Sequence, residues 1–187
     1  AMAEGARMAE KAGADIVDLN FGCPAKEVTG AACGSALMRT PDQAARIMEA
    51  VVQAVNRPVT VKMRMGWDEN SLNAADLARR AEALGVAAVT VHGRTRKQFY
   101  TGVADWDAVA EVKQAVAIPV IVNGDIITAE QAREALRRSG ADGLMLGRGV
   151  YCRPWLAAHL GRALMDRPRL AEADARPGDL LFLPYLA

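Results

Sequence analysis

A thiol stands where the first apolar run of the chain ends, in LNFGCPAKEVTGAACGSALM (residues 19–38). Cys23 lies between Gly22 and Pro24, two residues that fix a tight turn. A cysteine thiol has a reference pKa near ~8.5, so it can donate a proton as well as act as a nucleophile. No general base adjoins Cys23 in the sequence, which leaves proton donation and covalent catalysis both open. The plain alternative is a small apolar side chain that fills a turn.

Cations occupy the next apolar run, VTVKMRM. The alternation of a strand puts Lys62 and Arg64 on one face and the valines and methionines on the other. Burying a cation without a partner is expensive, so each needs an ion pair or a ligand. Lys62 has two interpretations: a salt bridge to Asp18 or Asp125, or a positive charge beside a cofactor ring that becomes anionic on reduction.

The last three runs also end in residues that could bind a ligand. His92 ends the run in TVHGRT, where ligand contact and a structural role are both open. Two glycine-containing loops follow, VNGDI (residues 122–126) and MLGRGV (residues 145–150). Glycine permits close backbone approach, and the first amides of a following helix can hold an anion. Arg148 would add a guanidinium to a bound phosphate, so we predict a phosphate site rather than two solvated turns.

These residues lie on elements that alternate along the chain. The apolar runs are residues 15–20, 59–65, 87–93, 118–124 and 142–148. Helical patterns lie near residues 41–55, 73–84, 105–115, 128–138 and 153–165, and the chain opens on another. Thr40 before Pro41 predicts a helix N-cap, and TAEQ at residues 128–131 predicts a capping box. Together the alternation predicts an α/β fold with a parallel sheet.

Two parallel architectures fit this alternation, an open doubly wound sheet and a (βα)8 TIM barrel. No G-x-G-x-x-G follows the first run, as an open dinucleotide-binding sheet would require. Polar residues instead lie at the C-terminal end of every run. In a barrel, the loops that follow the strands all meet at the C-terminal face. We therefore predict that residues 1–160 form part of a TIM barrel. Only about five C-terminal βα units of the eight are found, so the numbering is expected to begin partway through the barrel.

Composition is that of an ordinary globular protein. The 187 residues are 51% hydrophobic and 24% charged, with a net charge of +1, so no broad field favours nucleic acid or membrane, and binding to either would depend on local patches. Three cysteines, no CxxC and two histidines argue against a metal site and fit a reducing, cytoplasmic setting. The apolar runs are far shorter than the roughly 18 residues of a membrane span.

Five segments, taken in order, resemble the bacterial tRNA-dihydrouridine synthases. They are DLNFGCPAKEVTGAACGSALM, VTVKMRMGW, VTVHGRTRKQFYTGVADW, IPVIVNGDI and GADGLMLGRG with the RPW that follows. Each is weak alone, but their combination over residues 9–155 is specific. The resemblance implies an FMN-binding TIM barrel followed by a small helical RNA-binding domain. It also implies tRNA as the substrate, NADPH as the reductant, no metal and no membrane, and a monomer at full length.

The resemblance assigns a role to each candidate residue. It implies that flavin N5 passes a hydride to C6 of a tRNA uracil and that Cys23 protonates C5, giving 5,6-dihydrouridine. Lys62 and His92 match residues near the flavin ring, and Asn20 and Arg64 resemble residues that hold the uracil edges. The remaining matches are Asn123, Gly124, Asp125, Gly147 and Arg148 around the ribityl chain and phosphate, and Tyr100 near the base.

Two departures from the family lead to further expectations. The family's first three strands are absent, and with them a proline- and methionine-rich opening loop and a Gln that contacts flavin. Residues 161–187 do not resemble the helical domain, so we expect a fragment or a divergent tail. The alternatives are another FMN barrel oxidoreductase, such as a dihydroorotate dehydrogenase-like enzyme, or a non-catalytic barrel fragment. The GCP cysteine and the HGRTR cluster favour an RNA substrate over a free pyrimidine.

Overall fold

Five parallel strands form one sheet in the computed structural model, which describes residues 1–165. They are β1 (Val17–Phe21), β2 (Val59–Arg64), β3 (Ala88–His92), β4 (Val120–Asn123) and β5 (Gly143–Met145). Each lies within or next to one of the predicted apolar runs. The strands pair in chain order, β1-β2-β3-β4-β5, and every pairing is parallel. The predicted parallel α/β class is confirmed.

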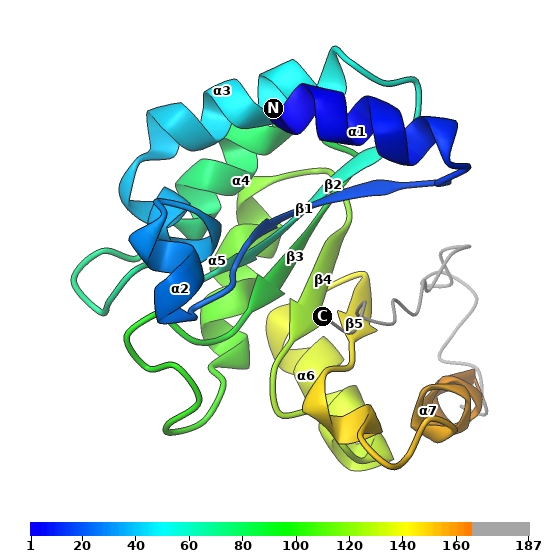
Figure 1. Cartoon of the computed structure of the whole chain (residues 1–187). Coiled ribbons are helices and arrows are strands. Elements are labelled where there is room, and N and C mark those ends of the chain that lie inside the picture. Colours follow the sequence, from blue (N-terminus) through cyan, green and yellow to red (C-terminus); the bar gives the residue numbers. More distant parts are fainter. Residues whose placement is uncertain (166–187) are drawn as a thin grey trace.

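Helices cover the outer, convex side of this curved sheet (Figure 1). The longer ones are α1 (Met2–Lys11), α3 (Pro41–Val52), α4 (Ala74–Ala83), α5 (Trp106–Ala115), α6 (Ala129–Ser139) and α7 (Leu156–Met165). Each of α3 to α7 packs against the next in chain order. A doubly wound sheet would reverse its strand order and carry helices on both faces. Within the described residues the winding runs in a single direction, which disfavours the open-sheet alternative.

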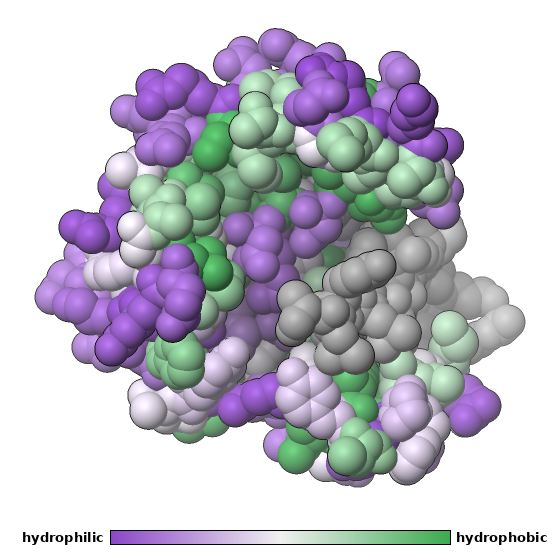
Figure 2. Space-filling view, in the orientation of Figure 1, coloured by the Kyte–Doolittle hydropathy of each residue, from purple (hydrophilic) through white to green (hydrophobic). Residues whose placement is uncertain are grey.

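The two faces of the sheet differ in chemistry. On β2, Val59, Val61 and Met63 are buried on the convex side, where each such side chain contributes about 1.5–3 kcal/mol. The opposite, concave face carries polar side chains. In register across β1 to β4 it presents Asn20 beside Lys62 and Thr90, and then Arg64 beside His92 and Asn123. Figure 2 shows a hollow lined by hydrophilic residues. The alternation predicted for β2 therefore holds, and it points the cations inward.

Helix ends follow the predicted signals with one exception. The capping box of α6 forms: Gln131 N donates to Thr128 Oγ1, and Gln131 Oε1 accepts from Thr128 N, each at 3.2 Å. Gly140 ends α6 in the left-handed conformation, with φ of 62°. The exception is Thr40, which precedes Pro41 at the start of α3 but makes no side-chain capping hydrogen bond.

Three short helical segments interrupt the loops at the carboxyl edge of the sheet. They are α2 (Lys26–Gly30), η1 (Gly34–Arg39) and η2 (Arg148–Val150). The predicted domain boundary between residues 160 and 161 falls inside α7. Residues 166–187 lie outside the described part, so the expected tail stays a prediction. In the described residues no helix is long and apolar enough to cross a bilayer.

Candidate active site

The loop after β1 holds Cys23 by all four polar backbone groups of Gly22 and Cys23. Asn20 Oδ1 accepts hydrogen bonds from both amide nitrogens, at 3.0 Å each. Arg64 Nε donates to the Gly22 carbonyl at 3.0 Å. Ser35 donates to the Cys23 carbonyl through its hydroxyl at 2.8 Å and its amide at 3.0 Å. Because each group already has a partner, the position of the Cys23 backbone is set before any ligand binds.

Gly34 completes this support by allowing close contact with the cysteine. Its φ is 56°, and a Cβ at this position would lie 2.8 Å from the Cys23 carbonyl oxygen and 3.1 Å from Cys23 Cβ. Sequence reasoning missed both Gly34 and Ser35. The only signal was their place in the same loop-rich stretch as the cysteine, which does not show that the chain folds back on it.

Arg64 connects the Cys23 loop to the loop after β3. Its side chain is 2% exposed, and Nη1 donates to the carbonyls of Thr95 and Phe99 at 2.8 and 2.9 Å. Burial is the main reason that the pKa of Arg64 falls to about 10, so the guanidinium stays charged at neutral pH. Two of the three guanidinium nitrogens of Arg64 therefore donate to backbone carbonyls, and Nη2 has no hydrogen-bond partner among the described residues.

Lys62 faces the same hollow without an ion pair in the described part of the chain. Neither predicted salt bridge forms: Asp18 accepts from Thr60 Oγ1 at 2.6 Å, and Asp125 pairs with Arg94. Burial, together with the charge of Arg64, lowers the pKa of Lys62 to about 8. An inward ammonium group without a carboxylate partner favours the ligand-binding interpretation of Lys62.

The thiol of Cys23 shares this electrostatic environment. Cys23 lies within electrostatic reach of both Lys62 and Arg64. The cysteine side chain is partly buried. The thiol and the cations therefore belong to one site on the concave face.

His92 is neutral at this site. Burial and the nearby charges of Lys62, Arg64 and Arg94 lower its pKa to about 2. Its ring is 9% exposed, and Nδ1 is buried without a hydrogen-bond partner in the described residues. A neutral imidazole is a poor acid near pH 7, which leaves the thiol as the better proton donor. The unpartnered Nδ1 is an open position for a ligand.

Asn123 and Gly124, at the end of β4, use much of their bonding capacity inside the fold. Asn123 Nδ2 donates to the Met145 carbonyl at 2.8 Å, and Trp106 Nε1 donates to the Gly124 carbonyl at 2.9 Å. Gly124 has φ of 119°, and a Cβ there would lie 2.7 Å from Ala104 Cβ. These contacts join the end of β4 to β5, to the start of α5 and to the loop before α5.

Asp125 forms a bidentate ion pair with Arg94, at 2.6 and 2.9 Å. Burial alone would raise the pKa of Asp125, but hydrogen bonds from Arg94 and the Ala104 amide outweigh it and lower that pKa. Arg94 is 2% exposed and also donates to the carbonyls of Thr101 and Gly102. The carboxylate of Asp125 thus shapes the loop between β3 and α5. No local pattern in the sequence indicates that Asp125 pairs with Arg94.

Arg148 and Tyr100 meet at the rim of the site. The Arg148 guanidinium lies 4.5 Å from the centre of the Tyr100 ring and 3.6 Å from Asp125 Oδ1. Both side chains are about half exposed, 53% for Arg148 and 45% for Tyr100. Beside them, among the described residues, only Asn123 Nδ2 lies as near as 4.0 Å to a Cβ placed at Gly147. This part of the rim can accept an anion.

Within residues 1–165, the concave face thus combines a thiol on an anchored loop, an ammonium group without an ion pair and a neutral imidazole, with an exposed guanidinium at its rim. All eleven residues singled out from the sequence lie on the carboxyl ends of the strands or in the loops that follow them. Among the described residues no group of three histidine, cysteine, aspartate or glutamate side chains could hold a metal ion.

Known proteins that are similar in sequence point to the same family as the five segments of the sequence analysis. The family model described as Dihydrouridine synthase (Dus) matches residues 1–175. A probable tRNA-dihydrouridine synthase of Rhizobium leguminosarum bv. phaseoli is 59% identical over 166 residues, which are 89% of this chain and 52% of that protein. tRNA-dihydrouridine synthase B of Pseudomonas syringae pv. tomato is 44% identical over 186 residues, covering 100% of this chain and 55% of that one. The chain therefore spans about half the length of the curated relatives it matches.

Among solved structures, 2,3-dimethylmalate lyase, a PEP mutase/isocitrate lyase superfamily member, is 19% identical with a TM-score of 0.65. The match covers 99% of this chain and 65% of that one. At this identity the likeness concerns the fold alone.

Proposed function

Because the chain belongs to the dihydrouridine synthase family, we propose that its protein reduces uridine in tRNA to 5,6-dihydrouridine, with FMN as cofactor and NADPH as reductant. The proposal includes a complete TIM barrel of which these five strands are one part. The observation that carries it is the fixed Cys23 loop beside an unpaired Lys62 on one concave face.

Two unpartnered polar groups support a flavin on this face. Lys62 has no ion pair and His92 Nδ1 no hydrogen bond within the described residues, so a ligand with acceptors and negative charge would satisfy them. We assign binding of the flavin ring to Lys62 and His92, and binding of the FMN phosphate to Gly147 and Arg148 at the rim. FMN supplies a hydride to C6 of the uracil when it is bound.

Cys23 is assigned as the acid that protonates C5. The loop fixes the backbone that carries the thiol. His92 is neutral because its pKa is lowered to about 2, and its remaining N–H is a very weak acid. Lys62, with a pKa of about 8, is largely protonated at neutral pH, and its charge balances negative charge on the cofactor ring.

Asn20 and Arg64 are assigned to the uracil edges through the donors that the loop leaves free. Asn20 Oδ1 is occupied by the two loop amides, so only its Nδ2 remains for a ligand. Arg64 likewise retains Nη2. Both remaining groups are donors, which match the two carbonyl oxygens of uracil. A base held in this way must leave the RNA stack, as in other enzymes that modify bases.

The test uses the full-length protein and an unmodified tRNA transcript. Cys23→Ala should lower dihydrouridine formation by about 10²- to 10⁴-fold while flavin stays bound, since only the acid is lost. The matched control is Cys152→Ala, which removes an exposed thiol and should leave turnover unchanged. Nucleoside mass spectrometry measures the product, and the flavin spectrum reports occupancy. Equal turnover by Cys23→Ala and wild type would show that Cys23 is not the acid. Turnover of free uracil but not of tRNA would show that tRNA is not the substrate.

A further inference from the structure

Trp67 contacts two arginine side chains at the same edge of the sheet as Cys23. The guanidinium carbon of Arg39 is 4.9 Å from the centre of the Trp67 ring system, and that of Arg96 is 4.7 Å from it. Arg39 ends η1, Trp67 follows β2, and Arg96 follows β3. Three separate loops thus build one cluster, the Arg39–Trp67–Arg96 cluster.

Neither arginine of this cluster has an anionic partner in the described part of the chain. Arg39 makes no hydrogen bond or ion pair there and is exposed. Arg96 Nε is buried without a partner, and Nη2 reaches only Thr29 Oγ1, at 3.4 Å. By contrast, Arg94 is held by a carboxylate and Arg64 by three backbone carbonyls. The indole therefore holds two cations in place without any internal charge to balance them.

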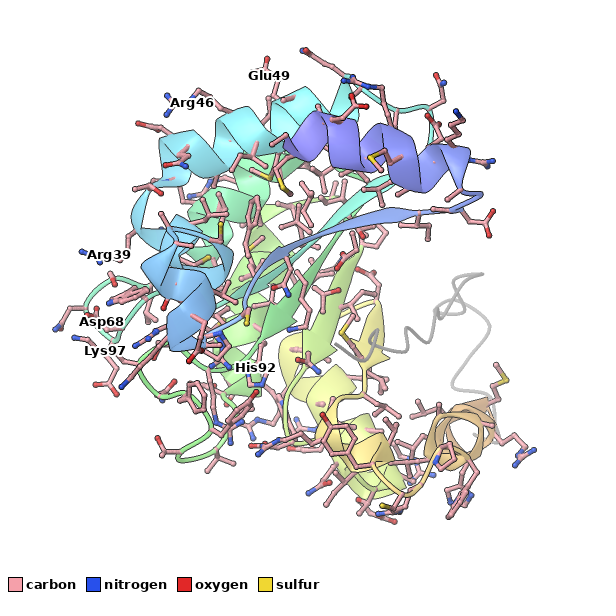
Figure 3. All side chains as sticks on the ribbon, in the orientation of Figure 1. Arg39, Arg46, Glu49, Asp68, His92 and Lys97 are labelled. Atoms are coloured by element: carbon pink, nitrogen blue, oxygen red, sulfur yellow. The ribbon has the colours of Figure 1, made fainter. Side chains whose placement is uncertain are left out.

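A groove of ≈ 580 Å³ runs beside the Trp67 ring. Arg39 and Lys97 line it, and its one carboxylate among the described lining residues, Asp68, is paired with Lys97 at 2.8 Å. Asn73 also lines it, and its Oδ1 is buried without a partner in the described residues. Figure 3 shows Arg39, Asp68 and Lys97 close together on one side of the molecule, with Arg46 and Glu49 well apart from them. The groove therefore offers positive charge that Asp68 does not cancel.

The cluster shares its loops with the residues that fix the thiol. η1 begins with Gly34 and Ser35, which contact Cys23, and it ends with Arg39. Arg96 follows directly on Thr95, whose carbonyl accepts from Arg64. An anion bound at the cluster is therefore placed relative to Cys23 by short, well-anchored segments.

We propose that the Arg39–Trp67–Arg96 cluster binds the phosphodiester backbone of the RNA strand that carries the target uridine. This proposal rests on the proposed function, because it takes the RNA as the ligand of this face. Guanidinium groups offer planar pairs of donors that match phosphate oxygens, and stacking on an indole fixes them in advance. A base reaching the thiol keeps its own phosphates close to the rim of the site, where this cluster lies.

The test measures binding of an unmodified tRNA transcript to the full-length protein by fluorescence anisotropy over a range of salt concentrations. Arg39→Gln and Arg96→Gln should each weaken binding by about five- to twentyfold and reduce the slope of log K against log salt by about 0.7–0.9. Arg39→Lys, which keeps the charge but loses the paired donors, should fall between wild type and Arg39→Gln. Arg46→Gln, an exposed arginine on α3 away from the cluster, is the matched control and should stay within about twofold.

Flavin reduction by NADPH should be unchanged in the two cluster variants, which separates RNA binding from loss of fold. Unchanged affinity and salt slope in both variants would overturn the cluster as an RNA site, and so would an equal effect of Arg46→Gln. If wild type forms dihydrouridine while the cluster variants bind tRNA normally, the cluster is not an RNA site but the proposed function stands. If wild type neither binds nor modifies tRNA, the proposed function fails with it.

Discussion

Ser35 contacts Cys23 through the Cys23 backbone carbonyl. Its side chain is fully buried, and its hydroxyl donates to the Cys23 carbonyl at 2.8 Å. Ser35→Ala leaves that carbonyl with the Ser35 amide as its remaining donor, so the loop should loosen without being lost. We expect kcat to fall by about five- to thirtyfold with KM for tRNA nearly unchanged, and the free energy of unfolding to fall by about 1 kcal/mol.

Ser139 provides the matched control for this prediction. It is 1% exposed, and its hydroxyl donates to the Ala135 carbonyl at 2.6 Å on α6, outside the site. Ser139→Ala should lower the free energy of unfolding by a similar amount and leave kcat unchanged. A similar kcat for Ser35→Ala and Ser139→Ala would mean that Ser35 serves stability only.

His92 makes stability depend on pH in the acid range. Its pKa is lowered from 6.5 to about 2, so between these values the unfolded chain binds more protons than the folded one. The free energy of unfolding therefore rises with pH up to about 6.5 and then levels, and at pH 5 His92 costs about 2 kcal/mol. His92→Gln in the flavin-free protein should lose about 2 kcal/mol less than wild type between pH 7 and pH 5.

Urea unfolding at the two pH values measures this difference. The other histidine of the chain, His159, is exposed on α7, and His159→Gln should follow the wild-type pH dependence. The same loss between pH 7 and pH 5 in wild type and His92→Gln would show that the imidazole of His92 is not kept neutral by the fold.

At the scale of elements, the end of β4 is fixed by a close approach to the loop before α5. Gly124 has φ of 119°, and a Cβ there would lie 2.7 Å from Ala104 Cβ and 3.3 Å from His92 Cε1. Gly124→Ala should therefore lower the free energy of unfolding by about 3 kcal/mol, part from the backbone and part from overlap. Adding Ala104→Gly should restore part of the loss, because it removes the nearest atom.

Gly102 separates the contribution of backbone strain from that of atomic overlap. Its φ is 66°, but no atom lies within 4 Å of a Cβ placed there, so Gly102→Ala should cost only about 1 kcal/mol. Chemical unfolding of the three variants gives the comparison. Equal losses for Gly124→Ala and Gly102→Ala would show that the approach to Ala104 is not tight.

The elements were predictable from sequence because their signals are local. Alternation in VTVKMRM predicted which face carries Lys62, and the TAEQ capping box predicted where α6 begins. The contacts that make the site are not local: Ser35 and Cys23 are 12 residues apart, and Arg64 and Gly22 are 42 apart. Sequence reasoning therefore found the thiol and missed what fixes it. The missing information is the path of the loops, which depends on tertiary packing.

At the scale of the whole molecule, the concave face of the sheet carries the candidate site, and the convex face packs against the helices to form the core. Chain-order pairing with all the long helices outside brings every strand's carboxyl end to one rim. This is why residues as far apart as Asn20 and Arg148 belong to one site. The same winding leaves β1 paired with β2 alone among the described residues. On the concave face of the described residues, Lys62 therefore has one strand, β1, on one side and three strands, β3 to β5, on the other.

This geometry predicts that the 187 residues alone bind FMN weakly. Small-molecule sites typically enclose about 70–90% of a ligand's surface, and an arc of five strands encloses much less of a flavin laid against Lys62 and His92. A chain with the length of the curated relatives should purify with flavin bound, while the 187-residue chain should lose it on gel filtration. The absorbance of bound flavin near the visible maximum measures both. Tight, stoichiometric flavin on the 187-residue chain would contradict the prediction, since the five strands would then form a sufficient pocket by themselves.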